Sequence, residues 1–194
     1  MDITRLIIVA VGGQGNLLAS KVLGEAALAK GIPVRMSEIH GMAQRGGVVE
    51  SSMVFGDAQS TIISDGDADV LVGFEPCETL RALKKCSEKT VVITNTSPIP
   101  PFTVTTGQGV YPDIDMVKSL IRKKTRELVV VDAAAMAGKA GNPMAVNMVL
   151  LGALIKTGVL PLSAEDVRDA IRTKTRKGVV ETNLSAFDLG YEAA

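Results

Sequence analysis

The most constraining feature of the sequence is an apolar run that ends in a glycine turn near the amino terminus. Residues 6–11 are apolar throughout, as in a buried strand, and Gly12, Gly13 and Gly15 follow directly. Apolar residues then recur at helical spacing over residues 17–30. Strand, glycine turn and helix in this order begin a doubly wound domain. The turn also directs backbone N–H groups and the positive end of a helix dipole at one point, which favours an anionic ligand group.

The rest of the chain alternates between apolar strands and helices. Strands are expected at residues 33–39, 48–55, 68–74, 90–94 and 127–132, and residues 61–63 could return as a hairpin. Helices are expected around residues 80–83, after the N-cap Asp113, and from a capping box at Ser163 and Asp166 to about residue 174. The proline-rich residues 95–112 read as a connecting loop. This pattern predicts an α/β fold with a doubly wound, mostly parallel, Rossmann-like sheet and helices on both faces.

The last third of the chain is expected to be helical. Asn142 is a favourable N-cap, Pro143 would occupy the first helical position, and Gly158 would end the helix. Residues 145–155 are apolar on every side, so this helix should be buried on several sides. Asn147 is its polar exception and needs hydrogen-bond partners there. The length of 194 residues and the absence of internal repeats favour a single α/β domain over residues 1–194.

The composition excludes several classes of function. Lys plus Arg and Asp plus Glu number 21 each, aromatic residues are 3% of the chain, and tryptophan is absent. The charge and stacking surface of a nucleic-acid binder is therefore missing. No signal peptide is indicated, and the most apolar segment is too short to cross a bilayer. We expect a soluble, cytoplasmic protein without nucleic-acid or membrane partners.

The two cysteines exclude a cluster held by this chain alone. Cys77 and Cys86 are nine residues apart in what reads as one helix, which would place them on opposite faces and prevent a disulfide. Neither has metal-ligand spacing, and an iron–sulfur cluster requires four thiolates. No metal site is predicted.

The glycine turn matches a dinucleotide-binding fingerprint only in part. Gly13 and Gly15 supply its first two glycines, but Leu18 stands where the third belongs. Glu38 follows Gly15 by 23 residues, about where a ribose-binding carboxylate would lie. A nicotinamide or flavin site is thus partly supported and partly contradicted. A tight strand-to-helix turn without a ligand remains an alternative.

A second motif, the loop at residues 40–47, contains the only histidine of the chain. His40 is followed by Arg45 and by Gly46 and Gly47, which allow a partner to approach the backbone closely. This loop should lie at the same sheet edge as the glycine turn, where open sheets bind ligands. Arg45 is a candidate contact for an anion or a protein interface, whereas His40 alone is as well explained by a structural role. One histidine and no nucleophile turn exclude a Ser/His/Asp arrangement.

A third pattern imitates a cofactor motif. Asp65, Gly66 and Asp67, with Asn95 further on, resemble a thiamine diphosphate metal motif. That motif requires a helix after the glycine, but an apolar strand follows here. We interpret residues 64–67 as a turn.

Four segments together resemble one family. They are VGGQG at residues 11–15, SEIHGMAQRGG at 37–47, NMVLLGAL at 147–154 and NLSAFDLG at 183–190. They are similar to the gamma-type domain of 2-oxoacid:ferredoxin oxidoreductases, and the similarity covers nearly the whole chain. The histidine–arginine loop most resembles that of the small subunits of indolepyruvate ferredoxin oxidoreductases.

The resemblance implies oxidative decarboxylation of a 2-oxo acid, such as an arylpyruvate, with coenzyme A to give an acyl-CoA and reduced ferredoxin. It implies thiamine diphosphate, magnesium and [4Fe–4S] clusters, which this chain cannot hold and a larger partner subunit must carry. The chain would complete the active site and help to receive CoA. Two loops are expected to hold the CoA phosphates. Their residues are Gly12, Gly13, Gln14, Gly15 and Asn16, and Gln44, Arg45, Gly46 and Gly47.

His40 and Arg45 are the candidates for a catalytic role. A free-standing dinucleotide-dependent oxidoreductase and a purely structural subunit remain alternatives. The identity of the 2-oxo acid and the subunit stoichiometry are not encoded in these motifs. An isolated chain could pair with itself through the surface meant for its partner.

Overall fold

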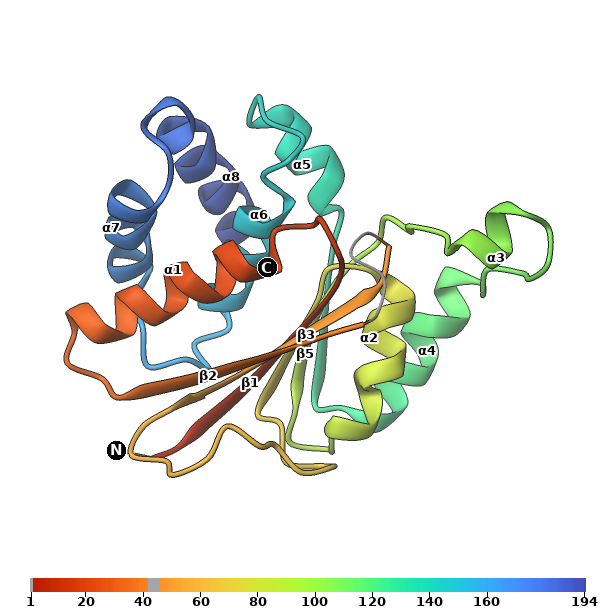
Figure 1. Ribbon diagram of the computed structural model, residues 1–194, viewed down its shortest axis with the longest axis horizontal. Helices are drawn as coiled ribbons and strands as arrows, with labels where there is room; N and C mark the ends of the chain where they lie inside the picture. The colour runs from red at the N-terminus through yellow and green to blue at the C-terminus, as the bar shows by residue number, and fades with distance from the viewer. Residues whose placement is uncertain (1, 42–45) are drawn as a thin grey trace.

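The computed structural model describes residues 2–41 and 46–194, which form one six-stranded sheet between two layers of helices (Figure 1). The strand order is β2-β3-β1-β4-β5-β6. The strands are β1 (Thr4–Val11), β2 (Val34–His40), β3 (Val48–Phe55), β4 (Val70–Gly73), β5 (Val91–Asn95) and β6 (Glu127–Val131). β1, β4, β5 and β6 pair in parallel, and β3 is antiparallel to both of its neighbours.

The antiparallel strand β3 determines where the site loops lie. Its register pairs Val48 with Val11, so β3 starts beside the point where β1 ends. The segment that leads into β3 therefore meets the glycine turn at the carboxyl edge of the sheet. A backbone hydrogen bond of 2.8 Å from Gly12 N–H to Gly47 O joins the two.

Helices cover the two faces unequally. One face carries α1 (Asn16–Ala29), α5 (Ala133–Lys139), α6 (Val146–Lys156), α7 (Ala164–Lys174) and α8 (Val180–Ala193). The other face carries α2 (Pro76–Ala82), which continues into a 3₁₀ turn (Leu83–Lys85), and α4 (Ile114–Lys124). A second 3₁₀ turn (Lys177–Val179) precedes α8, and the short α3 (Phe102–Thr105) stands away from the sheet (Figure 1).

Alternation along β1 separates two hydrophobic cores. Leu6, Ile8 and Ala10 pack into the larger core beneath α1 and α6, whereas Ile7 and Val9 pack into the smaller core beneath α2 and α4. Successive side chains of a strand point to opposite faces, so a strand buried on both sides must be apolar throughout. This explains the continuous apolar run at the start of the chain.

The buried helix α6 packs on α8 through two glycines. A Cβ built at Gly152 would lie 1.9 Å from the carbonyl oxygen of Phe187, and one at Gly190 would lie 1.9 Å from that of Val149. The two backbones touch at these positions, because any larger residue would occupy the space of a carbonyl. This contact anchors the carboxyl-terminal helix.

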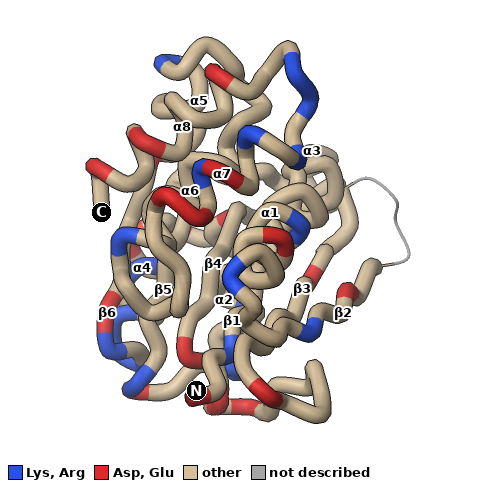
Figure 2. Tube along the Cα trace, turned by 90° about the vertical axis from the view of Figure 1, so that its left-hand side faces the viewer, with Lys and Arg blue, Asp and Glu red and all other residues tan. Residues whose placement is uncertain are grey.

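Ion pairs attach α7 to α1 across the surface. Lys30 pairs with Asp166 at 3.1 Å, and Lys174 pairs with Glu25 at 3.0 Å. Figure 2 shows basic and acidic residues interspersed along this side of the molecule. Within the described residues no helix is both long and apolar enough to span a membrane.

Most predicted elements are confirmed. The α/β class, the mostly parallel sheet and the helical last third are as expected, and β3 has the predicted bounds. Asp113 caps α4 by accepting a hydrogen bond from Met116 N–H at 2.9 Å. Ser163 and Asp166 form the predicted capping box of α7.

Four local predictions are wrong or incomplete. Residues 61–63 form no strand in the structure, since Lys85 Nζ holds the carbonyl of Ile63 at 2.7 Å. Cys86 lies beyond α2, so the two cysteines do not share a helix. Residues 95–112 contain α3 in addition to loop.

The start of α6 differs from the prediction as well. The helix begins at Val146 after the cap residue Ala145. The side chain of Asn142 instead accepts a hydrogen bond from Met144 N–H at 3.1 Å and closes a turn before the helix. Asn and Pro serve turns as readily as N-termini of helices, which explains the shift.

Gly152→Ala should destabilise the protein, because its Cβ would force α6 away from α8. We expect the free energy of unfolding to fall by about 1–3 kcal/mol. The matched control is Gly138→Ala in α5, where a Cβ meets nothing within 4 Å. This control should gain about 0.5–1 kcal/mol from the reduced backbone entropy of the unfolded chain. Urea denaturation measures both, and equal midpoints for the two variants would contradict the proposed helix contact.

Candidate functional site

The glycine turn is fixed by the side chain of Gln14. Val11 N–H donates to Gln14 Oε1 at 2.8 Å, and Gln14 Nε2 donates to the carbonyl oxygen of Phe74 at 3.0 Å. Gly13 and Gly15 have φ values of 103° and 83°, which favour glycine. Gln14 thus links the turn to the end of β4, and both ends of its amide are engaged in shaping the turn.

Several backbone N–H groups of the turn are available to a ligand. The first hydrogen bond of α1 runs from Ala19 N–H to Gly15 O at 3.1 Å. Within residues 2–41 and 46–194, no acceptor pairs with the backbone N–H of Gly13, Asn16 or Leu17. These donors and the helix dipole act at the same point, so the turn can bind an anionic oxygen.

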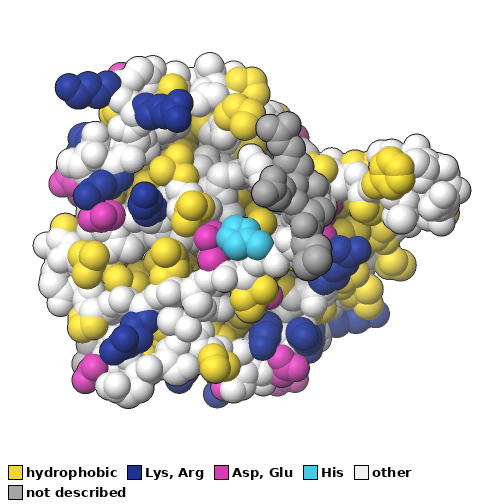
Figure 3. Space-filling view, in the orientation of Figure 1, with side chains coloured by type: hydrophobic (Ala, Val, Ile, Leu, Met, Phe, Trp, Pro, Cys, Tyr) yellow, Lys and Arg dark blue, Asp and Glu magenta, His cyan; other side chains and the backbone are white. Residues whose placement is uncertain are grey.

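A cavity of about 320 Å³ lies beside the turn. It is lined by residues of the turn, by Glu38 and His40 of β2, and by Val49 of β3. Glu38 accepts a hydrogen bond from Ser51 Oγ at 3.1 Å and pairs with His40 Nε2 at 3.3 Å. Figure 3 shows the histidine beside an acidic side chain near the middle of this face. The cavity therefore offers donors at the turn and a carboxylate at β2.

Two asparagines support the turn from beneath. Asn147 of α6 donates from Nδ2 to Gly15 O at 3.2 Å and accepts from Met148 N–H at 3.0 Å. The polar exception of the buried helix thus has the partners that the sequence required. Asn16 is buried and its Nδ2 lies 3.5 Å from Val49 O, while its Oδ1 has no partner among the described residues.

The structure brings together most of the predicted site residues. Gly12 and Gly47 are hydrogen-bonded neighbours, and His40 lies at the rim of the cavity beside the turn. The two loops therefore share one edge of the sheet, as predicted. Gln44 and Arg45 fall outside the described residues, so their predicted contacts stay predictions.

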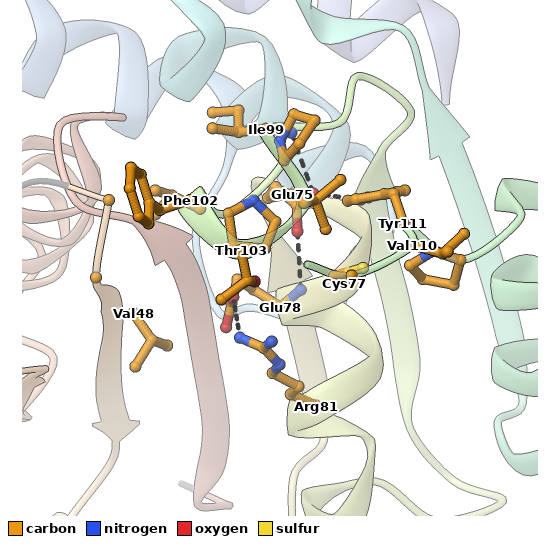
Figure 4. A pocket seen from close by; sticks show the side chains of 18 residues that line it. Val48, Glu75, Cys77, Glu78, Arg81, Ile99, Phe102, Thr103, Val110 and Tyr111 are labelled. Carbon is orange, nitrogen blue, oxygen red and sulfur yellow. Dashed lines mark hydrogen bonds and ion pairs between the residues drawn. The ribbon is translucent and has the colours of Figure 1, made fainter. Parts of the chain in front are cut away.

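A second, larger cavity of about 560 Å³ was not predicted from the sequence. Val11 lines both cavities, and the second one extends from Gly46, Gly47 and Val48 to α2 and the segment before α4. In Figure 4, Val48 and Phe102 lie toward one end, and Cys77 and Tyr111 toward the other. Most of its lining is apolar. Its polar side chains are those of Glu75, Cys77, Glu78, Arg81, Thr103 and Tyr111.

The buried carboxylate of Glu75 organises this cavity. It accepts hydrogen bonds from the backbone N–H of Glu78 at 3.0 Å, from the backbone N–H of Ile99 at 3.2 Å, and from the hydroxyl of Tyr111. Glu75 is thus the N-cap of α2 and the anchor of a distant segment. Pro76, at the first helical position, could have marked the start of α2, but the pairing of Glu75 with Tyr111, 36 residues away, had no local signature.

Burial raises the pKa of three side chains in this cavity. It raises the pKa of Glu78, an effect that nearby Arg81 opposes and nearby Glu75 reinforces. Burial likewise raises the pKa of the Cys77 thiol and, together with hydrogen bonds to Cys77 and Glu75, that of the Tyr111 hydroxyl. A protonated thiol is a poor nucleophile, so the cavity is suited to binding rather than to covalent catalysis.

The residues present do not fit the cofactors that the resemblance implies. Cys77 and Cys86 are too few thiolates for an iron–sulfur cluster. Asp65 pairs with Lys85 at 3.1 Å in a turn that leads to a strand, so this segment does not receive a diphosphate. Among the described residues, no three His, Cys, Asp or Glu side chains gather as metal ligands.

Comparison with known proteins gives the family. The model of the pyruvate ferredoxin/flavodoxin oxidoreductase family matches residues 5–193. The chain belongs to this family. It is 42% identical to the indolepyruvate oxidoreductase subunit IorB of Methanothermobacter thermautotrophicus, over 98% of this chain and 97% of the relative. It is 41% identical to subunit IorB of Pyrococcus horikoshii, over 98% of this chain and 95% of that one.

Solved structures share the fold. The pyruvate oxidoreductase subunit PORC of Thermotoga maritima superposes with a TM-score of 0.74 at 25% identity, covering 100% of this chain and 97% of that chain. The gamma subunit of a keto/oxoacid ferredoxin oxidoreductase of Geobacter sulfurreducens has a TM-score of 0.72 at 22% identity, covering 98% of each chain. Both comparison chains are single subunits of larger oxidoreductases according to their names.

Glu78→Gln should stabilise the protein at neutral pH. A carboxyl with a raised folded-state pKa stabilises the fold below its unfolded pKa of about 4.3, and this contribution is lost as the pH rises through the folded-state pKa. The neutral amide avoids that loss, so the variant should unfold at higher denaturant at pH 7 and like the wild type near pH 4.

Glu165→Gln is the control of opposite sign. Hydrogen bonding to Arg172 lowers the pKa of this exposed carboxyl. This variant should therefore lose stability at pH 7 and match the wild type only at acidic pH, below the folded-state pKa. The same pH dependence for both variants would contradict the assignment of Glu78.

Proposed function

We propose that this chain is the non-cofactor subunit of an indolepyruvate ferredoxin oxidoreductase. In the assembled enzyme, a 2-oxo acid of the arylpyruvate class would be oxidatively decarboxylated with CoA to an acyl-CoA and reduced ferredoxin. The identity of 42% to subunit IorB across nearly the full length of both chains carries this proposal. The relative named 2-oxoglutarate synthase subunit KorC of Methanocaldococcus jannaschii is only 29% identical, which favours the indolepyruvate class.

The cofactors of the reaction would be bound by a larger partner subunit. Two cysteines are too few thiolates for a [4Fe–4S] cluster, and Asp65 is engaged by Lys85 in a turn before a strand. Thiamine diphosphate on the partner would supply the decarboxylation chemistry, and its clusters would pass electrons to ferredoxin. The role of this chain would be to bind CoA, orient it and exclude water at the shared edge.

The glycine turn is the proposed site for CoA phosphates. The N–H groups of Gly13, Asn16 and Leu17, which have no acceptor among residues 2–41 and 46–194, and the dipole of α1 favour a phosphate at this point. Arg45, from the sequence motif, would add a charge-assisted contact. A structural neighbour with the same fold is described as a 2-oxoglutarate:ferredoxin oxidoreductase from Magnetococcus marinus with coenzyme A bound. It has a TM-score of 0.75 at 19% identity and covers all of this chain.

The carboxylate of Glu38 restricts how CoA can lie in the smaller cavity. A phosphate placed against Glu38 would meet like charge, whereas a hydroxyl group could donate to it. If a CoA phosphate lies at the turn and a ribose hydroxyl points toward β2, the phosphate meets the N–H donors and the hydroxyl can donate to Glu38. The Glu38–His40 pair would then orient the ribose, a positioning role for His40 without a proton-transfer step.

The same geometry supports a second candidate, a free-standing dinucleotide-dependent oxidoreductase. A glycine turn followed by a carboxylate on the second strand is typical of nucleotide sites. Leu18 argues against it, because its side chain packs against the main core where the fingerprint has its third glycine. Binding of NAD or flavin to the purified chain, abolished by Glu38→Ala, would favour this candidate.

Leu17→Glu should weaken CoA binding without harming the fold. Leu17 lies in the first turn of α1, lines the smaller cavity and is 51% exposed. A carboxylate in the first turn stabilises a helix by about 0.3–1 kcal/mol, yet it would repel a phosphate at the turn. In the assembled enzyme we expect the KM for CoA to rise by about tenfold, which corresponds to about 1.4 kcal/mol.

The control places the same charge at the other end of the helix. Leu28→Glu at a position that is 60% exposed should leave the KM for CoA unchanged. Arg45→Ala should raise that KM as well. If Leu17→Glu and Arg45→Ala both left the KM for CoA and the turnover at wild-type values, the CoA assignment would be abandoned.

A further inference from the structure

An uncharged arm projects from the fold beside the larger cavity. Residues 95–112 contain no Asp, Glu, Lys, Arg or His, although 22% of the whole chain is charged. In Figure 1 the part of this segment around α3 stands apart from the sheet and its helices. Figure 3 shows it as a lobe on the right of the molecule with hydrophobic side chains on its surface.

The apolar side chains of the arm are unusually exposed. Phe102 is 77% and Val110 is 93% exposed, and Ile99 is 41% exposed. All three line the cavity of about 560 Å³, together with Val48 at the start of β3. An exposed phenylalanine on a projecting segment without charges is typical of a surface that another protein covers.

The arm is anchored at both stems by one buried group. Ile99 N–H and the Tyr111 hydroxyl both donate to the carboxylate of Glu75. Asn95 adds two contacts at the base, donating to Phe74 O at 3.1 Å and accepting from Ala133 N–H at 3.1 Å. These bonds hold the two ends of the arm together, so α3 is presented in a defined position. Preorganised segments bind with a smaller entropic cost.

We propose that the arm, residues 95–112, docks onto the larger, cofactor-bearing subunit, and that an apolar segment of that subunit fills the cavity beneath α3. This inference rests on the proposed function. The absence of charge on the arm fits an apolar partner surface. The cavity also adjoins Val11 and Gly47, so it continues the edge at which bound CoA would have to face the partner.

The larger subunit fits better than a second copy of this chain. In the Magnetococcus marinus protein the match covers 31% of one longer chain, so there the fold is covalently joined to a larger part of the same enzyme. A self-interface would also need to leave the CoA edge open to the partner, although the arm borders that edge. The arm and the edge are best covered by one partner together.

The test compares two exposed positions at opposite edges of the sheet. Phe102→Asp places a charge on the arm. The control Ile62→Asp changes a residue that is 82% exposed and lies near the start of β2, at the other edge. The larger subunit is obtained by co-expression and purified, and its binding to the wild-type chain and to each variant is measured by titration calorimetry. Ultracentrifugation measures the mass of the wild-type chain and of each variant alone. We expect the Kd to rise at least about tenfold for Phe102→Asp and less than about twofold for Ile62→Asp.

Each other outcome has a definite meaning. Equal affinity of the wild type and Phe102→Asp overturns the docking arm and leaves the proposed function intact. If the wild-type chain does not bind the larger subunit at all, the proposed function fails. If the isolated chain is a dimer that Phe102→Asp dissociates, while binding to the larger subunit is unchanged, the arm is a self-interface and the inference is wrong. Unchanged thermal unfolding of both variants excludes misfolding as the cause.

Discussion

The carbonyl oxygen of Phe74, at the end of β4, is the point on which the functional edge depends. It accepts one hydrogen bond from Gln14 Nε2 in the glycine turn and one from Asn95 Nδ2 at the end of β5. The turn that would bind CoA and the segment that becomes the arm are therefore fixed to the same atom. The carboxyl ends of parallel strands lie at one edge of the sheet, and the side-chain amides of Gln14 and Asn95 fix the positions of the loops at that edge.

The two cavities at this edge have groups suited to binding rather than to catalysis. The smaller cavity has amide donors at the turn and a carboxylate at Glu38, which together suit a ligand with phosphate and hydroxyl groups. The larger cavity is mostly apolar, and its thiol and phenol are kept protonated by burial. Neither cavity contains an activated nucleophile or a metal-binding cluster within the described residues. Such a surface can position a co-substrate and dock a partner, and in the proposed enzyme the partner would supply the reactive cofactors.

The sequence predicts what is encoded locally and misses what is encoded at a distance. The bounds of β3 and the capping box at Ser163 follow from neighbouring residues, and both are confirmed. The antiparallel direction of β3 could not be predicted, because the pattern of apolar residues along a strand is the same whichever way the strand runs. The pairing of Glu75 with Tyr111 joins residues far apart in the chain, so the larger cavity and its arm emerged only from the structure. The glycine turn is predictable from the sequence because its strand, turn and helix are contiguous, whereas CoA as its ligand follows only from the family resemblance.

The most direct measurement of the central claim is reconstitution of activity from separate subunits. The larger subunit and this chain would be purified apart and assayed for ferredoxin reduction with indolepyruvate and CoA, alone and after mixing. We expect that neither chain turns over alone and that mixing restores ferredoxin reduction that depends on both the 2-oxo acid and CoA. Full CoA-dependent activity of the larger subunit without this chain, or NAD-dependent oxidation by this chain alone, would contradict this expectation.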